Sequence, residues 1–333
     1  MSAVQQLKFV PLRPLAREEA IDHPSGYLAL SSQNQRFMLD STPGFIAYRV
    51  QGKHFIALGG VHAPLSSRAI LLDGFLAEAD RQGCGVVVVQ VGQSQLELFH
   101  SRGFTVNQFG TTYGLDLRHF SLAGTKRVKL RHKIKQAQTA DLQVLEVGRS
   151  FPANATTFAQ LHQISNAWLR AKGKKELDFM IGELGTPQET ERRIFVVTDA
   201  HYHFQGFITY VPVWGEHPGY LHDLTRRLPD APTGTMELCN AHAIERFVAE
   251  GVRYLHFGFT PFITDGVKEP HGSRLVTTLV HLLGTYGSAV YPAQRQVQYK
   301  LKWGPDFVER EFLACRPLSL RAIIDLLILT RSV

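Results

Sequence analysis

The sequence predicts an α/β protein made of two similar halves, each with a mixed, mainly antiparallel sheet flanked by helices. The chain has 333 residues, a length that favours two domains. Strand and helix patterns alternate along it with hairpins between them, and the second half repeats the order of elements in the first. No short fixed period occurs, which argues against a solenoid. We place the domains at residues 1–148 and 149–333.

The first half begins with a hairpin and continues with a helix and a buried strand. Residues 45–50 and 54–58 have strand composition and flank the turn Gln51-Gly52. Residues 66–82 have apolar positions at helical spacing and stop before a glycine. The β-branched run at 86–91 predicts a buried strand. Further elements are a short helix at 94–101 and strands beginning at Gly103 and Gly114.

The second half contains both element types in similar order. Strands are predicted at 144–147, 194–198, 204–211 and 254–259. Helices are predicted at 156–171, 236–250, 272–286 and 320–329. The last helix has an apolar face that suits either a membrane surface or burial against the second domain, and we favour burial.

Composition sets limits on the class of protein. The net charge is +7 and the pI about 9.3, which suits a polyanionic partner such as nucleic acid or anionic lipid, although an ordinary basic protein has the same balance. The three cysteines are far apart and show no metal spacing, so we expect a reducing cytoplasm and no metal site. No signal-peptide core and no apolar run long enough to span a bilayer is present.

A basic segment at 126–135 carries six cations in ten residues. On a helix, Arg127, Arg131 and Lys135 share one face, where like charges repel unless an anion lies between them. This predicts contacts with phosphate groups of either tRNA or a lipid surface. The alternative is a solvated basic helix without a partner.

Asp223 and Arg226 follow an expected strand at Tyr220-Leu221 and precede a Pro-rich turn. At a strand end, Arg226 could clamp a phosphate or carboxylate, and Asp223 could bind an ammonium or orient a hydroxyl. The alternative is an internal Asp–Arg ion pair that only shapes a loop.

Lys300 and Lys302 alternate with apolar residues over residues 299–303. In a strand the two lysines would point to one face, where they would hold an anion or stabilise developing negative charge. The alternative is an exposed edge strand protected by lysines. Other reaction classes find no support, because no G-x-S-x-G, P-loop or G-x-G-x-x-G pattern occurs.

Several separate segments together resemble the aminoacyl transferase domain of the bacterial phosphatidylglycerol lysyltransferase family (DUF2156). They span roughly residues 44–316 in the family's order. They are the hairpin with Tyr48, Gln51-Gly52 and Ile56 to Gly59, F-S-L-x-G-x-K-R-x-x-L-R from Phe120, Ile164 to Leu169, D-x-x-R…P-x-A-P-x-G-x-M-E from Asp223, F-G-F-T-P from Phe257 and Y-K-x-K-W-x-P from Tyr299. The resemblance implies two tandem GNAT-like domains, with most of the active site in the second.

The resemblance also implies an activity: transfer of an amino acid from aminoacyl-tRNA, as co-substrate and without another cofactor, to a hydroxyl or amine acceptor. Phosphatidylglycerol or a related lipid is the leading acceptor, and a small molecule remains an alternative. By this resemblance the catalytic residues are Asp223, Arg226 and Lys300. Substrate-binding residues are Lys302, Glu237, Glu176 and His222, and the residues that contact tRNA or other phosphates are Lys126, Arg127 and Arg131.

Two other functions stay open at this point. One is an acyltransferase that uses acyl-CoA, although the acetyl-CoA loop pattern of GNAT enzymes is not found. The other is a non-catalytic module that binds tRNA or an anionic membrane. We expect a cytoplasmic protein, with peripheral contact to the inner face of the membrane as an alternative. The sequence leaves the amino acid and the oligomeric state open.

Overall fold

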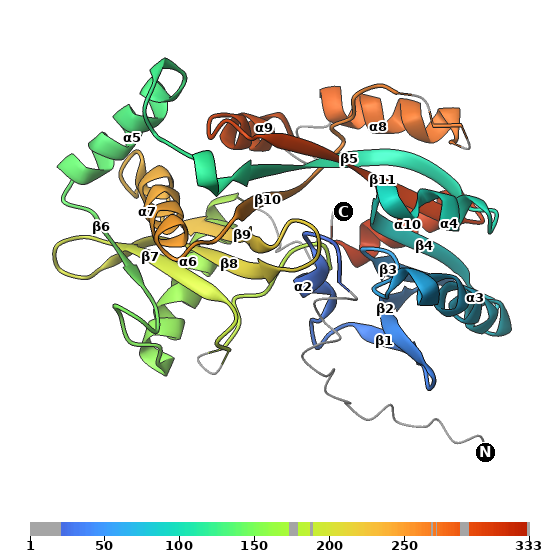
Figure 1. Cartoon of the computed structure of the whole chain (residues 1–333). Coiled ribbons are helices and arrows are strands. Elements are labelled where there is room, and N and C mark those ends of the chain that lie inside the picture. Colours follow the sequence, from blue (N-terminus) through green and yellow to red (C-terminus); the bar gives the residue numbers. More distant parts are fainter. Residues whose placement is uncertain are drawn as a thin grey trace.

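The computed structural model describes residues 21–172, 179–186, 189–267, 269–270, 272–286 and 293–331. Its strands form one sheet in the order β1-β2-β3-β4-β11-β5-β10-β9-β8-β7-β6 (Figure 1). The strands are β1 (Gln35–Leu39), β2 (Thr42–Gln51), β3 (His54–Leu58), β4 (Gly85–Gly92), β5 (Thr105–Asp116), β6 (Gln143–Glu146), β7 (Arg193–Thr198), β8 (Phe204–Val213), β9 (Gly219–Arg227), β10 (Tyr254–Pro261) and β11 (Phe307–Arg316).

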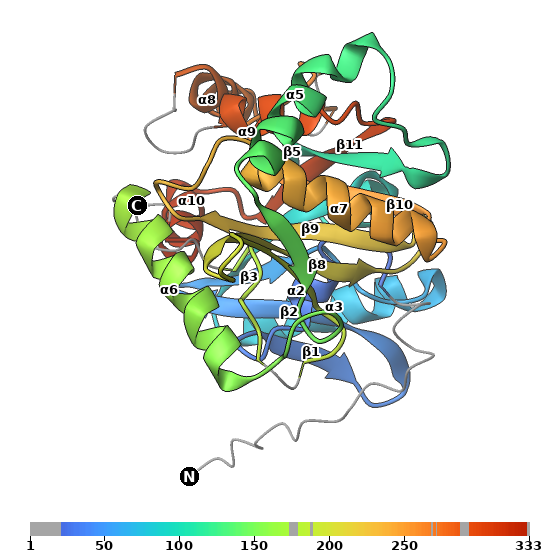
Figure 2. The same cartoon turned by 90° about the vertical axis from the view of Figure 1, so that its left-hand side faces the viewer.

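Helices cover both faces of this sheet (Figures 1 and 2). They are α2 (Gly26–Ala29), α3 (Leu65–Arg81), α4 (Leu96–His100), α5 (Val128–Thr139), α6 (Ala155–Lys172), α7 (Thr235–Ala249), α8 (Arg274–Tyr286), α9 (Ala293–Leu301) and α10 (Leu320–Leu329), with short 3-10 turns at Gln93–Gln95, Leu117–His119 and Thr125–Arg127. Within the described part of the chain, no helix has both the length and the apolar character needed to cross a membrane.

Each half contains one parallel strand pair in an otherwise antiparallel arrangement. β3 pairs in parallel with β4, and β9 pairs in parallel with β10. The other pairings between named strands are antiparallel. The expectation of a mixed, mainly antiparallel α/β fold is therefore confirmed.

The last strand of the chain completes the first half of the sheet. β11 lies between β4 and β5 and is antiparallel to both. On its other edge β5 pairs with β10, so strands from the two halves form one continuous sheet. The predicted boundary at residues 148 and 149 stays a prediction, because strands are shared across it.

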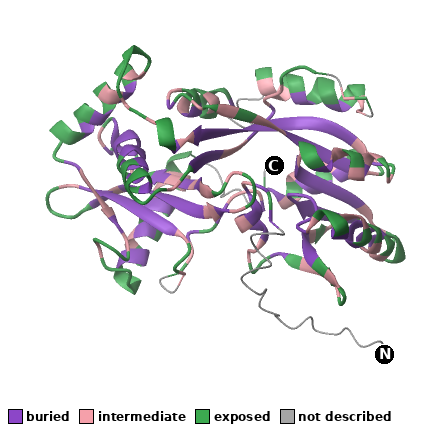
Figure 3. Ribbon diagram, viewed as in Figure 1, coloured by how far each residue is buried: buried purple, intermediate pink, exposed green. Residues whose placement is uncertain are grey.

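Burial follows the alternation and spacing of apolar residues. Strands β3, β4 and β7 are buried along most of their length, which agrees with their unbroken β-branched and aromatic runs (Figure 3). α3 buries Leu71, Leu72, Phe75 and Leu76 against the first half, while Ile70 stays exposed. α10 buries Ala322 and Leu326 in a core cluster, so the favoured burial of this helix is confirmed for one of its sides.

Two segments differ from the sequence-based expectations. Residues 299–303 were expected to be a strand, but α9 runs to Leu301 and a turn follows. The expectation was wrong because five alternating residues also fit a helix end: α9 buries Ala293 and Lys300, seven residues and two turns apart. β1 and β11 were not expected at all. The two strands expected from Gly103 and from Gly114 form one continuous strand, β5, and the other predicted helices and strands lie within a few residues of the observed ones.

Candidate active site

The candidate site lies where β9 and β10 diverge. The parallel register extends from Tyr254↔Gly219 to His256↔Leu221 and then stops, although both strands continue. A β-bulge in the β8–β9 pairing accompanies this divergence, since Thr209 stands opposite both Asp223 and Leu224. Backbone groups beyond the last pair are free of the ladder between these strands, so side chains and ligands can use them. We call this region the β9–β10 divergence.

Asp223 is buried and held by several donors. Its carboxylate accepts hydrogen bonds from the Arg192 Nη1 at 2.7 Å, from the Gly182 backbone N–H at 2.9 Å and from the Thr209 hydroxyl at 3.4 Å. Burial raises the pKa of Asp223 above its usual value, although Arg192 and Arg226 act in the opposite direction. Asp223 therefore has a fixed position and a well-defined counter-charge.

Arg192 is the residue that sequence reasoning missed. Its side chain is 6% exposed, it also binds Glu189 at 3.1 Å, and its guanidinium lies 5.6 Å from the centre of the Tyr27 ring. The only signal in the sequence was the pair Arg192-Arg193 directly before a predicted strand. Arginines at that position are usually exposed, so the pattern alone does not single one out.

Arg226 is also buried, but its surroundings differ from those expected if it formed an ion pair with Asp223. Its guanidinium stacks on the ring of Trp168, 4.2 Å from the ring centre, and its Nη1 donates to the Thr225 carbonyl. A cation–π contact of this kind helps to hold the guanidinium in position. Arg226 still contributes positive charge near Asp223.

Lys300 brings α9 against the end of β10. Its Nζ donates to the Gly258 carbonyl at 2.7 Å, the Phe259 carbonyl at 3.2 Å and the Thr260 hydroxyl at 2.6 Å. The side chain is buried, and burial lowers the pKa of Lys300 to about 7. An amine with this pKa exchanges its proton near neutral pH, which an exposed lysine does not do.

His222 joins the Lys300 side of the divergence. Its Nε2 lies 2.6 Å from the Thr225 hydroxyl, and its ring contacts the rings of Tyr210, Phe257 and Tyr299. Burial and the nearby charge of Lys300 lower the pKa of His222 to about 3, so the imidazole is neutral. It can therefore exchange hydrogen bonds with a substrate without adding charge.

Glu237 and Lys302 form an ion pair next to this region. The Lys302 Nζ lies 2.6 Å and the Lys133 Nζ 3.3 Å from Glu237 Oε1. Burial acts to raise the pKa of Glu237, but Lys302 and Lys133 outweigh it and the pKa is lowered. Lys302 also lies over the ring of Tyr299, 3.9 Å from its centre. These contacts attach α7 to α5 and to the turn after α9.

The site residues predicted from the sequence therefore fall into two clusters at one divergence. Asp223 and Arg226 gather with Arg192 and Trp168, while Lys300 gathers with His222. Gly258 belongs to the second cluster, because its carbonyl accepts from Lys300 and a Cβ at this position would lie 3.7 Å from the His222 carbonyl oxygen. The two clusters are connected through β9, where His222 and Asp223 are consecutive residues. Glu176 lies outside the described residues.

Arg127 and Arg131 hold backbone in place. Arg127 donates to the Trp303 carbonyl at 3.1 and 2.9 Å, and Arg131 donates to the Leu122 and Gly124 carbonyls at 2.6 and 2.7 Å. Exposed lysines on the same segment are Lys126, Lys129, Lys133 and Lys135. A phosphate contact by Arg127 or Arg131 stays a prediction, and the exposed lysines are better placed for it.

The equivalent divergence in the first half is filled by side chains. β3 and β4 are in register from His54↔Gly85 to Leu58↔Val89. Beyond that point the Gln95 side chain accepts from the Val61 N–H at 2.9 Å, and the buried His62 imidazole donates to the Leu58 carbonyl. In the second half, the Lys300 amine bonds in a comparable way to the Gly258 and Phe259 carbonyls.

A family model described as phosphatidylglycerol lysyltransferase, C-terminal, matches residues 13–315. The chain belongs to this family. Similar relatives include phosphatidylglycerol lysyltransferases of Staphylococcus epidermidis, 22% identical over 85% of this chain and 33% of the relative, and of Staphylococcus aureus, 24% identical over 90% and 35%. The chain thus spans about a third of the length of these relatives.

Solved structures of the same fold agree with this membership. L-PGS from Bacillus licheniformis has a TM-score of 0.75 and 22% identity, with 94% of each chain covered. The C-terminal DUF2156 domain of a protein from Agrobacterium fabrum has a TM-score of 0.78 and 19% identity, with 96% of each chain covered. The expected fold class, α/β with a mixed, mainly antiparallel sheet flanked by helices, is confirmed for this family member.

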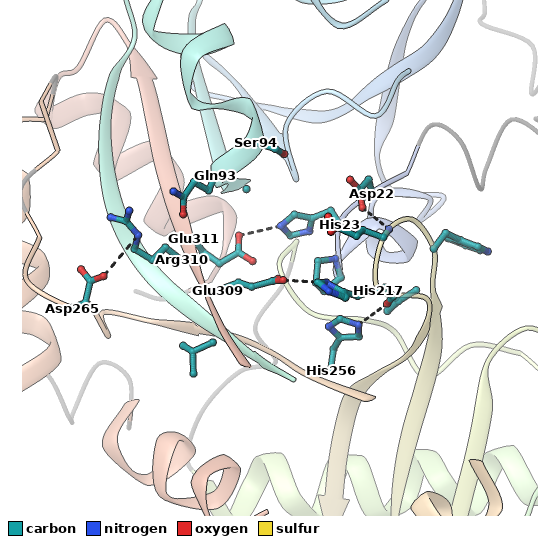
Figure 4. Close-up of a pocket in the computed structure, with 16 residues that line it drawn as sticks. Asp22, His23, Gln93, Ser94, His217, His256, Asp265, Glu309, Arg310 and Glu311 are labelled. Carbon is teal, nitrogen blue, oxygen red and sulfur yellow. Dashed lines mark hydrogen bonds and ion pairs between the residues drawn. The ribbon is translucent and has the colours of Figure 1, made fainter. Parts of the chain in front are cut away.

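This member of the family also has a pocket of about 470 Å³ between its halves, away from the β9–β10 divergence (Figure 4). Its wall contains buried His23 bound to Glu311 at 3.0 Å and His217 bound to Glu309 at 3.3 Å. Burial opposes protonation of His23, but Glu311 and Glu309 outweigh it and raise its pKa. The pocket residues come from six separate parts of the chain, and the sequence patterns gave no indication of it.

The burial of Lys300 predicts how the free energy of unfolding changes with pH. In the unfolded chain this amine has a pKa near 10.5, whereas in the folded protein it is about 7. Between these values the unfolded state binds the extra proton, so this residue makes the free energy of unfolding increase as pH rises from about 7 to 10. Urea unfolding of the native protein and of Lys300→Met at pH 7 and 9.5 measures the difference. Parallel pH dependences would contradict the burial of an ionisable Lys300.

Proposed function

We propose that the protein transfers an amino acid from aminoacyl-tRNA to a hydroxyl group of phosphatidylglycerol or a related lipid. The observation that carries the proposal is the pairing of a fixed Asp223–Arg192 cluster with a low-pKa Lys300 at one β9–β10 divergence. Membership of the family and the name of its relatives, phosphatidylglycerol lysyltransferase, support the reaction class.

The reaction moves an acyl group between two oxygens. The acceptor hydroxyl oxygen attacks the ester carbonyl carbon, a new C–O bond forms, and the bond to the ribose oxygen breaks. The acceptor's proton ends on the ribose oxygen, so charge and electrons balance without a further reagent. Since the ester is already activated, the enzyme needs mainly to orient both substrates and to stabilise the transient oxyanion.

Lys300 is the group proposed to stabilise this negative charge. All three protons of a charged Nζ have acceptors, namely two carbonyls and the Thr260 hydroxyl. A hydroxyl can rotate away at little cost, so a substrate oxygen would reach Nζ by replacing Thr260. His222, neutral and adjacent, would orient the acceptor without competing for the charge.

Asp223 and Arg226 are proposed to hold the charged ends of the substrates. The Asp223 carboxylate accepts three donors in the structure, and ionised carboxylates have about four acceptor sites. One site thus remains for the α-ammonium of the amino acid. Arg226, held over the ring of Trp168, is proposed to supply positive charge toward a phosphate of the lipid headgroup.

The polyanionic donor is proposed to meet the exposed lysines of the segment 126–135. These lysines project from α5 and the turn before it, and Lys133 also contacts Glu237, next to the candidate site. Phosphate contacts by lysines provide affinity without sequence specificity, which suits a tRNA body. Because aminoacyl-tRNA is made in the cytoplasm, we place the reaction there, at the inner face of the membrane.

A direct transfer assay tests the proposal. Purified protein is incubated with a pool of radiolabelled aminoacyl-tRNAs and detergent-dispersed phosphatidylglycerol, and the label is then separated into lipid, small-molecule and tRNA fractions. We expect label in the lipid fraction that depends on both substrates. Transfer only from acyl-CoA, or tight binding of tRNA without any transfer, would reject the proposed function.

A further inference from the structure

Helix α8 presents an apolar stripe to solvent. Leu275 and Tyr286 are 83% and 78% exposed, and Leu279 and Leu282 are 44% and 47% exposed. Their spacing of four, three and four residues places them along one side of the helix. Buried Val276 and Val280 lie roughly 100° around the helix from this stripe, so one wide apolar arc of α8 extends from its buried side onto the exposed surface (Figure 3). A continuous exposed stripe of this kind marks an interaction surface.

The stripe belongs to a face of the molecule built from helices without acidic residues. α5, α8 and α9 contain no Asp or Glu, whereas they carry cations that include Arg274, Arg295 and the lysines of α5. Both views of the fold, which differ by a turn about the vertical, place these three helices at the top (Figures 1 and 2). The acidic residue shortly before α8, Glu269, is bound to Arg310 at 2.8 Å.

We propose that α8 docks on an anionic phospholipid bilayer, with Leu275, Leu279, Leu282 and Tyr286 in its interfacial region. Apolar residues with a flanking tyrosine and nearby cations are the composition of helices that lie in the membrane interface. The surrounding positive charge adds attraction to anionic headgroups. A second copy of the chain fits this face less well, because association would bring cations against cations.

Docking through α8 would place the membrane next to the candidate site. The inner side of α8, with Val276 and Val280, packs in the same core cluster as Phe259 and Phe262. Phe259 and its neighbours Gly258 and Thr260 are the residues that hold the Lys300 amine. The choice of a phospholipid surface as the partner of α8 rests on the proposed function. Docking on such a surface can nevertheless be measured without tRNA and without transfer.

Vesicle flotation tests this proposal. The full chain is mixed with vesicles of pure phosphatidylcholine or of phosphatidylcholine with phosphatidylglycerol, and the floating fraction is measured at low and high salt. We expect binding to the anionic vesicles. Leu275→Ser/Leu279→Ser/Leu282→Ser should lower the partition coefficient by on the order of tenfold or more, because each change removes apolar surface from the interface.

A matched control uses exposed apolar residues on α3. Leu65 and Ile70 are 80% and 56% exposed, and α3 also carries Asp73, Glu78 and Asp80. Leu65→Ser/Ile70→Ser should float like the native protein, and circular dichroism should show that both variants are folded. Equal flotation of the α8 variant and the native protein, or no flotation of the native protein, overturns the proposal.

Two further outcomes separate the alternatives. If the α8 variant turns a dimer into a monomer while flotation is unchanged, the face belongs to a second copy and the bilayer proposal is wrong. If flotation is lost in the α8 variant while transfer to detergent-dispersed lipid continues, docking is supported independently of the chemistry. Absence of transfer by the native protein, while it still floats, counts against the proposed function alone.

Discussion

Replacing Lys300 by methionine is expected to lower the rate of aminoacyl transfer by about 100- to 1000-fold, the usual cost of removing one donor to a developing oxyanion. Methionine fills the same volume, and it also removes a buried amine whose pKa is lowered by burial. The variant should therefore be at least as stable as the native protein at neutral pH. Single-turnover transfer from a labelled aminoacyl-tRNA, together with a melting curve, measures both effects.

The pH dependence of the same reaction provides a second measurement. Only the protonated amine brings a positive charge to the oxyanion, and its pKa is about 7. The native rate should therefore fall as pH rises through this value, and the residual rate of Lys300→Met should lack that decrease. Lys53→Met, a change of an exposed lysine in the β2–β3 turn, is the control and should transfer normally. A native rate that climbs through pH 7 would mean that Lys300 acts as a base.

Replacing Arg192 by methionine is expected to lower the free energy of unfolding by about 3–5 kcal/mol, because it leaves the buried Asp223 carboxylate without its counter-charge. Adding Asp223→Asn should restore much of this loss, since the amide needs no counter-charge. Urea unfolding of the native protein, both single variants and the double variant gives the coupling between the two residues.

Arg246→Met is the control for this double-mutant cycle. Its side chain is 51% exposed and it pairs with Glu250 at 3.4 Å, so Arg246→Met should change stability by no more than about 1 kcal/mol. If Arg192→Met proves as mild as this control, or if the double variant is simply the sum of the two singles, the Asp223–Arg192 pair does not organise the site.

The sequence singled out residues of the candidate site more readily than their partners. The side chains of Asp223, Arg226 and Lys300 are buried, and the family resemblance was needed to favour them over an internal ion pair or an exposed edge strand; their roles stay predictions. The partner of Asp223 could not be read, because Arg192 is 31 residues away and only the β7–β8–β9 pairing brings the two together. The role of Trp168 under Arg226 depends in the same way on how α6 packs.

β11 shows why part of the fold could not be predicted. This central strand carries Glu309, Arg310 and Glu311, three consecutive charges that are unfavourable in a buried strand. Each charge has a partner from elsewhere in the chain: Glu311 binds His23, which is 288 residues away, and Arg310 binds Glu269. Local hydrophobic patterns contain no information about such distant compensation.

The position of β11 constrains how the protein is made. Until the ribosome has released residues 307–316, β4 and β5 have no strand between them, and each exposes an unpaired backbone edge. The sheet of the first half therefore cannot be completed until the entire second half has been synthesised. Neither half is a unit that natural truncation or gene fission could separate, and a nascent chain stalled before its last strand becomes a target for chaperones or proteases.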